Sequence, residues 1–270
     1  MERLTKRVTM SNSKIKFDDG EAYERMMGVW SRYVGEKFLD WLSLPSGKCW
    51  ADIGCGNGAF SEQILKVCDP ISVRGIDPSV AQIDFAKSRP GAKKAIFEIG
   101  DAMALPFEDE KFDVVTMALA LFFVPDPVQG VAEMKRVVRR DGVVAAYMWD
   151  MLGGGAPMEP IHAALRLKKI SYPLPPSAEA SRVDDMLELW RNAGFRSIES
   201  KVITVEREFI DFDDFWDTTT CSPAITSVLQ GLDVTALNEV KDSTREFLAI
   251  KSGELVVCTG TANCIKGVVH

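Results

Sequence analysis

The chain has 270 residues, of which 46% are hydrophobic and 26% charged, the composition of a globular protein with a sizeable core. Its formal net charge of −7 argues against a general binder of nucleic acids or of membrane surfaces, since such proteins present a basic face. The six cysteines include no C-x-x-C pair and there are only two histidines, so we expect reduced thiols and no metal site. The sequence shows no signal peptide and no long apolar run, so we expect a cytoplasmic protein without a membrane span.

The first predicted element is an amphipathic helix. Its large apolar residues recur three and four positions apart, at Tyr23, Met26, Met27 and Trp30. The helix either only covers the core or forms a lid over a pocket, because Tyr and Trp combine a large face with a polar edge. A second helix is predicted over residues 36–44, and residues 1–45 together are predicted to be an N-terminal helical cap.

Strands and helices then alternate along the central part of the chain. The predicted strands are 48–53, 71–76, 95–99, 112–117 and 142–149, and the predicted helices are 60–67, 79–88 and 127–138. Strands separated by helices predict an α/β fold with a parallel sheet and crossover helices on both faces. Residues 46–150 are therefore predicted to be the cofactor-binding core of a single domain that covers residues 1–270.

The pattern changes after Asp150. A hinge of three consecutive glycines at 153–155 begins a predicted lid insertion, 151–177, and a mostly helical segment forms a second one, 209–250. The remaining segments, 178–208 and 251–270, contain a helix at 179–193 and two more strands at 195–208 and 254–266. We therefore expect seven strands in one sheet.

A glycine-rich loop follows the first strand. Gly54-x-Gly56-x-x-Ala59 satisfies the relaxed dinucleotide fingerprint, and Asp77 ends the second strand where it could bind ribose hydroxyls. Glycine is needed where the backbone approaches a ligand or takes positive φ, and the next helix offers free N–H groups. An NAD(P)-dependent oxidoreductase is one interpretation of these residues.

Two acidic residues favour a different cofactor. Asp52 lies two residues before Gly54, where a carboxylate would repel a pyrophosphate but suits the amino and sulfonium groups of S-adenosylmethionine. After the third strand, Asp101 could accept the adenine amino proton, and the Ala102 N–H could donate to the ring.

The chain resembles the class I S-adenosylmethionine-dependent methyltransferases of the type 11, ubiquinone/menaquinone-biosynthesis-like group. The matching residues cover about 48–149: Asp52-Ile53-Gly54-Cys55-Gly56-Asn57-Gly58, Gly75-Ile76-Asp77-Pro78-Ser79, Gly100-Asp101-Ala102 with Leu105-Pro106-Phe107, Phe112-Asp113-Val114-Val115 and Pro125-Asp126-Pro127. The resemblance implies a Rossmann-like, mostly parallel sheet with an antiparallel last strand, and a methyltransferase activity (EC 2.1.1.-) on a small-molecule acceptor.

It also implies roles for individual residues. Those expected to line the cofactor are Tyr23, Trp30, Asp52, Gly54, Cys55, Gly56, Asp77, Pro78, Asp101, Ala102, Ala118 and Leu119. Of these, Asp77 would bind the ribose, Pro78 would pack on the adenine, and Leu119 would lie near the methyl group. Structural alternatives stay open, because Asp77 could cap the following helix and Asp101 could be a turn residue.

No catalytic residue is assigned. The segment 119–123 after the fourth strand has no titratable group, whereas many relatives are polar there, and His162 is a candidate base that could equally be a packing residue. Tyr147, Trp149 and Asp150 are candidates to line the acceptor side. We expect an apolar or aromatic acceptor, in a pocket formed by Met27, Trp30, Phe122, Phe123, Met151, Met158, Phe212, Phe215 and Trp216. A non-catalytic cofactor-binding protein on the same fold also stays open, as does the choice between a monomer and a homodimer.

Overall fold

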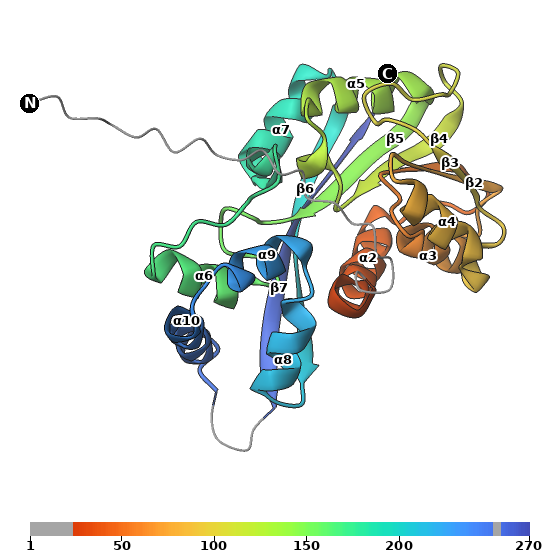
Figure 1. Cartoon of the computed structure of the whole chain (residues 1–270). Coiled ribbons are helices and arrows are strands. Elements are labelled where there is room, and N and C mark those ends of the chain that lie inside the picture. Colours follow the sequence, from red (N-terminus) through yellow and green to blue (C-terminus); the bar gives the residue numbers. More distant parts are fainter. Residues whose placement is uncertain (1–23, 251–254) are drawn as a thin grey trace, which may run out of the picture.

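The computed structural model describes residues 24–250 and 255–270. One twisted sheet lies between two groups of helices (Figure 1). In chain order the elements are η1 (Glu24–Gly28), α2 (Val29–Leu42), β1 (Cys49–Ile53), α3 (Ala59–Val67), β2 (Ser72–Asp77), α4 (Val80–Ser88), η2 (Pro90–Ala92), β3 (Ile96–Ile99), β4 (Phe112–Ala118), η3 (Leu121–Phe123), α5 (Pro127–Val137), β5 (Val138–Trp149), α6 (Glu159–Leu167), η4 (Ala178–Ser181), α7 (Val183–Asn192), β6 (Arg196–Phe209), α8 (Phe212–Thr219), α9 (Pro223–Gln230), α10 (Val234–Phe247) and β7 (Val256–Val268).

The sheet has seven strands in the order β3-β2-β1-β4-β5-β7-β6. The pairs from β3 to β5 are parallel, and β7 runs antiparallel to both of its neighbours, β5 and β6. The predicted fold class is therefore confirmed, including the antiparallel last strand. The order changes direction at β1, with β2 on one side and β4 on the other, and ligands of open α/β sheets bind at such a switch point.

Each face of the sheet has its own apolar core. Side chains such as Trp50 of β1 and Tyr147 of β5 pack with Phe38 of α2 and Phe60 of α3 on one face. On the other face, Met117 of β4 packs with residues of α5 and α7. The alternation of side chains along a strand decides which residues share a face.

The N-terminal helices differ from the prediction. Instead of two helices, the chain forms one continuous helical segment, because the π-helical turn η1 runs directly into α2, which ends at Leu42. Gly35 is a packing residue in this helix, since a Cβ there would meet the Gln63 side chain of α3 at 2.2 Å. Tyr23 lies outside the described residues.

The β6–β7 pair extends past the carboxyl end of β5. The last β5 residue, Trp149, pairs with Ala262, whereas the β6–β7 ladder continues to Phe209 and Val256. Helices α6, α8, α9 and α10 gather around this extension (Figure 1). The two predicted insertions therefore meet, and Lys168 Nζ lies 3.0 Å from Glu239 Oε2 between them. Their action as lids stays a prediction.

Candidate functional site

The glycine loop between β1 and α3 is held by hydrogen bonds to β2. The Gly54 and Cys55 amides donate to the Ile76 carbonyl at 2.7 and 2.9 Å. Gly54 and Gly56 have φ values of +71° and +50°, which favour glycine. A Cβ on Gly54 would lie 2.4 Å from the Ala120 Cβ, so this loop also needs glycine in order to pass the end of β4.

Asp52 is the charged side chain that is buried beneath this loop. It is 0% exposed, and its Oδ2 accepts a hydrogen bond of 2.6 Å from Ser61 Oγ of α3. Its Oδ1 has no hydrogen-bond partner in the part of the chain that the structure describes. Burial raises the pKa of Asp52 to about 7. The hydrogen bond from Ser61 opposes this shift, and the negative charge of Asp77 adds to it. A carboxylate held in this way would be stabilised by a cationic partner.

Asp77 links the loop to the start of the next helix. Its Oδ2 accepts from the Gly56 N–H and its Oδ1 from the Ser79 N–H, both at 2.9 Å. Burial raises the pKa of Asp77, although these two hydrogen bonds oppose the shift. The alternative that Asp77 caps helix α4 is wrong, because Ser79 is the cap residue and its Oγ accepts from Gln82 N.

The predicted adenine side is open to solvent. Pro78 and Asp101 are exposed, and Ala102 is half-buried. Asp101 Oδ1 accepts from the Met103 N–H at 2.9 Å, so the alternative of a turn residue is confirmed. A carboxylate has further lone pairs, so this turn leaves Asp101 able to accept another hydrogen bond.

The chain bends sharply where β4 ends. Leu119 has a φ of +55°, and its N–H donates to the Tyr147 carbonyl of β5 at 2.8 Å. A left-handed leucine costs roughly 1–2 kcal/mol, and such strained residues cluster at functional sites. Ala118 precedes it as the last residue of β4. The carboxyl ends of β1, β2 and β4 thus bring the predicted residues to one edge of the sheet.

The N-terminal segment reaches the glycine loop through Glu24. Its Oε2 accepts from Asn57 Nδ2 at 2.8 Å and from Arg89 Nη2 at 2.7 Å. Arg89 also donates to the Asn57 carbonyl at 3.0 Å and to Glu62 at 2.9 Å. We name Glu24, Asn57, Glu62 and Arg89 the loop clamp. Sequence reasoning did not identify these four residues.

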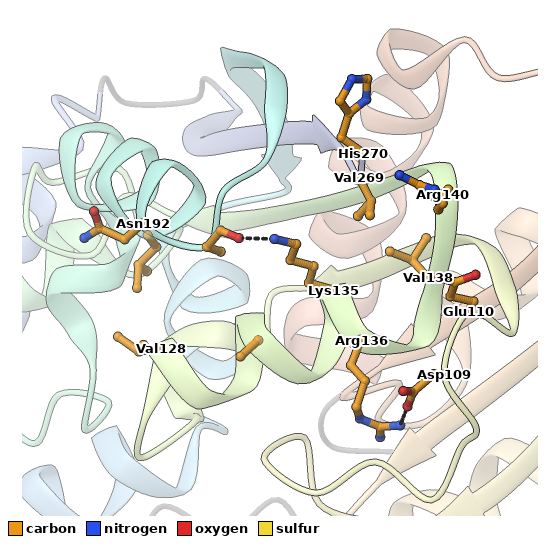
Figure 2. Close-up of a pocket in the computed structure, with 13 residues that line it drawn as sticks. Asp109, Glu110, Val128, Lys135, Arg136, Val138, Arg140, Asn192, Val269 and His270 are labelled. Carbon is orange, nitrogen blue, oxygen red and sulfur yellow. Dashed lines mark hydrogen bonds and ion pairs between the residues drawn. The ribbon is translucent and has the colours of Figure 1, made fainter.

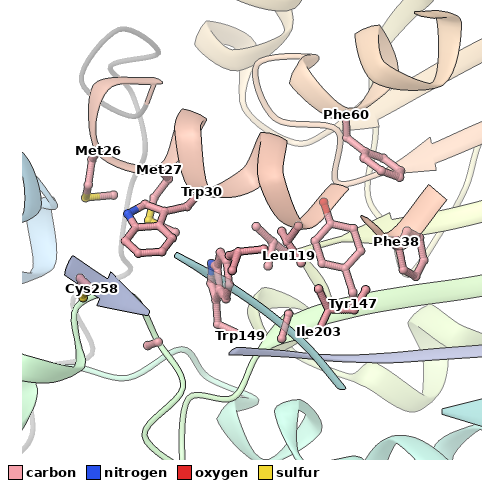
Figure 3. Close-up of a cluster of buried hydrophobic side chains, with 14 of the residues drawn as sticks. Met26, Met27, Trp30, Phe38, Phe60, Leu119, Tyr147, Trp149, Ile203 and Cys258 are labelled. Carbon is pink, nitrogen blue, oxygen red and sulfur yellow. The ribbon is translucent and has the colours of Figure 1, made fainter. Parts of the chain in front are cut away.

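Trp30 faces the predicted acceptor side instead of the loop clamp. Its ring meets that of Trp149 edge-on, with centroids 6.3 Å apart and an interplanar angle of 84° (Figure 3). Both rings belong to an apolar cluster with Leu119 and with Phe215 and Trp216 of the helical segment 209–250. These side chains pack together in the core, and their role in binding an acceptor stays a prediction. Phe122 and Phe123 are corrections, because both pack with the core of the opposite face.

His162 lies in helix α6 and is 3% exposed. Its ring stacks on Tyr172 with centroids 4.2 Å apart. Burial and the nearby charge of Arg166 lower the pKa of His162 to about 4, so the imidazole is neutral at pH 7. These contacts are those of a packing residue, the second of the two roles considered for it.

A cavity of about 700 Å³ opens at the opposite, amino edge of the sheet (Figure 2). Lys135, Arg136 and Arg140 contribute to its lining, and Arg136 binds Asp109 at 2.7 Å. It is separate from the predicted cofactor residues at the carboxyl edge. Among residues 24–250 and 255–270, no three His, Cys, Asp or Glu side chains gather as a metal site would require.

Comparison with known proteins agrees with this site. Residues 51–146 match the family described as "Methyltransferase domain". Over this segment the chain is similar to methyltransferase domains. The segment contains the glycine loop, Asp52, Asp77, Asp101 and the end of β4, so the predicted cofactor residues from Asp52 to Leu119 all lie within it.

Curated proteins similar to this chain include two methyltransferases, one named for a hydroquinone and one for a menaquinone. The 2-methyl-6-phytyl-1,4-hydroquinone methyltransferase 2 of Oryza sativa subsp. japonica is 30% identical over 177 residues, 65% of this chain and 47% of that protein. The demethylmenaquinone methyltransferase of Staphylococcus aureus (strain JH9) is 30% identical over 145 residues, 53% of this chain and 56% of that protein. The chain thus spans about half the length of these curated relatives.

A solved structure is similar over most of the chain. The putative methyltransferase from an antibiotic biosynthesis pathway of Anabaena variabilis aligns with a TM-score of 0.63 at 18% identity, and the alignment covers 88% of this chain and 97% of that one. This likeness shows the Rossmann-like fold.

Proposed function

We propose that this chain is an S-adenosylmethionine-dependent methyltransferase that acts on a small apolar or aromatic molecule. Asp52 carries the proposal. A fully buried Asp52 with one oxygen engaged by Ser61 is stable as an ionised carboxylate only when a cation or donors approach the other oxygen. S-adenosylmethionine brings an ammonium and a sulfonium, whereas the pyrophosphate of a dinucleotide would add negative charge.

The residues around Asp52 fit the remainder of that cofactor. Gly54 and Gly56 have only backbone to present, and Cys55 between them is buried. Asp77 already fixes the Gly56 N–H and has lone pairs left for ribose hydroxyls. Pro78 and Asp101 are exposed where an adenine would lie. Each of these assignments is part of the proposal.

The bound cofactor would supply a methyl group on a positively charged sulfur, and the C–S electron pair would stay on that sulfur as the acceptor atom forms its bond to the methyl carbon. The chain contributes orientation and the exclusion of water. Leu119 and Trp30 are buried apolar side chains on this face of the sheet. The segment 119–123 contains no titratable group that could take a proton from the acceptor.

The apolar cluster supports the acceptor class. Trp30, Trp149, Phe215 and Trp216 are all buried on the side of the site that faces away from Asp77. Of the two relatives described above, one is named for a phytyl hydroquinone and the other for a menaquinone. Hydroquinones and phenols with apolar substituents are therefore the acceptors to test first.

A transfer assay with methyl-labelled S-adenosylmethionine tests the proposal. Acceptors are offered as matched sets of hydroquinones, phenols, amines and carboxylates, and the label is counted in each extracted product. We expect label in hydroquinones or phenols, and its loss in the Asp52→Asn variant. A clear preference for highly charged acceptors would contradict the acceptor class.

A further inference from the structure

A second buried polar atom lies on the same face of the sheet as Asp52. Trp149 is 3% exposed, and in the described part of the chain its indole Nε1–H has no hydrogen-bond acceptor. A buried donor that stays unpaired costs roughly 1–3 kcal/mol. A ligand that offers an acceptor to this N–H would recover that free energy.

Sheet geometry places Trp149 on the same face of the sheet as Asp52. Asp52 shares its face with Trp50, and Trp149 shares its face with Tyr147, because side chains two positions apart point the same way. Trp50 and Tyr147 belong to one apolar cluster, so Asp52 and Trp149 face the same side of the sheet. Strand β4 lies between β1 and β5, so these two strands are roughly 10 Å apart, and the register Asp52–Thr116–Ala145 places Trp149 four residues, roughly 13 Å, further toward the carboxyl edge.

The surroundings of Trp149 suit a flat aromatic molecule. Its neighbours in the cluster include Trp30, Met27 and Leu119 (Figure 3). Both indoles pack closely on Gly260, since a Cβ there would meet Trp149 Cζ3 at 3.0 Å and Trp30 Cζ3 at 3.3 Å. An aromatic ring that displaced Trp30 would contact apolar side chains and one hydrogen-bond donor, the indole N–H of Trp149.

We propose that Trp149 determines acceptor specificity by donating its Nε1–H to a carbonyl or hydroxyl oxygen on the aromatic methyl acceptor. This inference rests on the proposed function and specifies its acceptor. Trp149 is buried, so the helix that carries Trp30 must shift when the acceptor enters. Asp52 would hold the methyl donor on one side of Leu119, and Trp149 would hold the acceptor on the other.

Binding of two matched probes tests this role. The probes are 1-tetralone and tetralin, which share a bicyclic skeleton and differ in one carbonyl oxygen, and calorimetry measures their affinities with S-adenosylhomocysteine present. The variant Trp149→Phe keeps a ring but removes the N–H. Trp50→Phe is the matched control, because Trp50 is 1% exposed and its Nε1 also has no acceptor among the described residues, but it lines a cavity at the amino edge.

We expect Trp149→Phe to weaken 1-tetralone binding about 5- to 20-fold and to leave tetralin within about twofold. Trp50→Phe should change the affinity for neither probe. If Trp149→Phe weakened the binding of both probes equally, Trp149 would be a packing residue and the proposal would be overturned. If the wild type did not bind 1-tetralone, the proposed acceptor class would be overturned. A protein that does not bind S-adenosylhomocysteine would instead refute the proposed function itself.

A measurement on the wild type covers the case in which Trp149→Phe does not fold. The indole N–H proton of Trp149, assigned through the backbone by NMR, should move downfield when 1-tetralone is added and stay in place with tetralin. An unmoved signal at saturating 1-tetralone would overturn the proposal.

Discussion

Arg89 Nη2 lies 2.7 Å from Glu24 Oε2, and this ion pair fastens the N-terminal helix to the glycine loop. The Arg89 side chain is 13% exposed, so solvent screens the pair less than it screens a surface ion pair. Because Arg89 also donates to the Asn57 carbonyl, the same guanidinium holds both the N-terminal helical segment and the glycine loop.

The variant Arg89→Gln should therefore weaken cofactor binding by about 5- to 30-fold, since a charge-assisted hydrogen bond contributes about 1.5–3 kcal/mol and only part of it acts through the loop. Titration calorimetry with S-adenosylhomocysteine measures the change. Arg74→Gln is the control, because Arg74 makes an ion pair with Glu98 between β2 and β3. Equal effects of the two variants would show that the loop clamp has no special role.

The variant Asp52→Asn should stabilise the cofactor-free protein at high pH. The folded pKa of about 7 lies above the ordinary value of 3.8, so the folded state holds a proton that the unfolded chain releases. The resulting stability is fully present below about pH 4 and is lost as pH rises through 7. Thermal unfolding at pH 8 should give the variant the higher Tm, and the difference should shrink toward pH 4. A lower Tm for the variant at pH 8 would contradict the burial argument.

His162 should produce the opposite pH dependence. Its folded pKa of about 4 lies below the ordinary 6.5, so its contribution to stability is present above pH 6.5 and is lost as pH falls toward 4. The variant His162→Phe keeps a ring to stack on Tyr172 and cannot be protonated. Its Tm should fall less than that of the wild type between pH 6.5 and 4.5. Parallel curves would mean that His162 is not buried as a neutral group.

Gly54 and Gly47 offer a matched pair for the packing of the loop. Both have positive φ, +71° and +73°, but a Cβ at Gly47 meets nothing within 4 Å, whereas one at Gly54 would meet the Ala120 Cβ at 2.4 Å. Gly47→Ala should cost about 1–2 kcal/mol of unfolding free energy. Gly54→Ala should cost at least about 1 kcal/mol more, because the overlap adds strain. Urea unfolding measures both, and equal values would contradict the close approach of the loop to β4.

The alternating core of the fold was predictable because its signals are local. Most of the parallel strands are short apolar runs that end at or just before a glycine or an acidic residue, as at Asp77, and the predicted bounds lie within a few residues of the observed ones. The predicted break between two N-terminal helices was wrong, because Gly35 lies inside α2, where the lack of a side chain lets α2 pack closely on Gln63 of α3.

The parts of the site that were missed depend on contacts between distant residues. Glu24 and Arg89 are 65 positions apart, and neither belongs to a motif. The burial of Phe122 on the opposite face follows from the turn after Leu119, whose positive φ has no signal in a leucine. The unpaired acceptor Asp52 Oδ1 and the unpaired donor Trp149 Nε1 can likewise be recognised only in the folded structure, where both atoms are buried.

Titration calorimetry of the wild type and Asp52→Asn with S-adenosylmethionine, S-adenosylhomocysteine and NADH tests the central claim most directly. We predict that the wild type binds both S-adenosyl ligands and not NADH. Asp52→Asn should weaken S-adenosylmethionine about 10- to 100-fold, and S-adenosylhomocysteine less, because the latter lacks the sulfonium charge. Tight binding of NADH alone, or an unchanged affinity for S-adenosylmethionine in the variant, would contradict the role of the buried carboxylate.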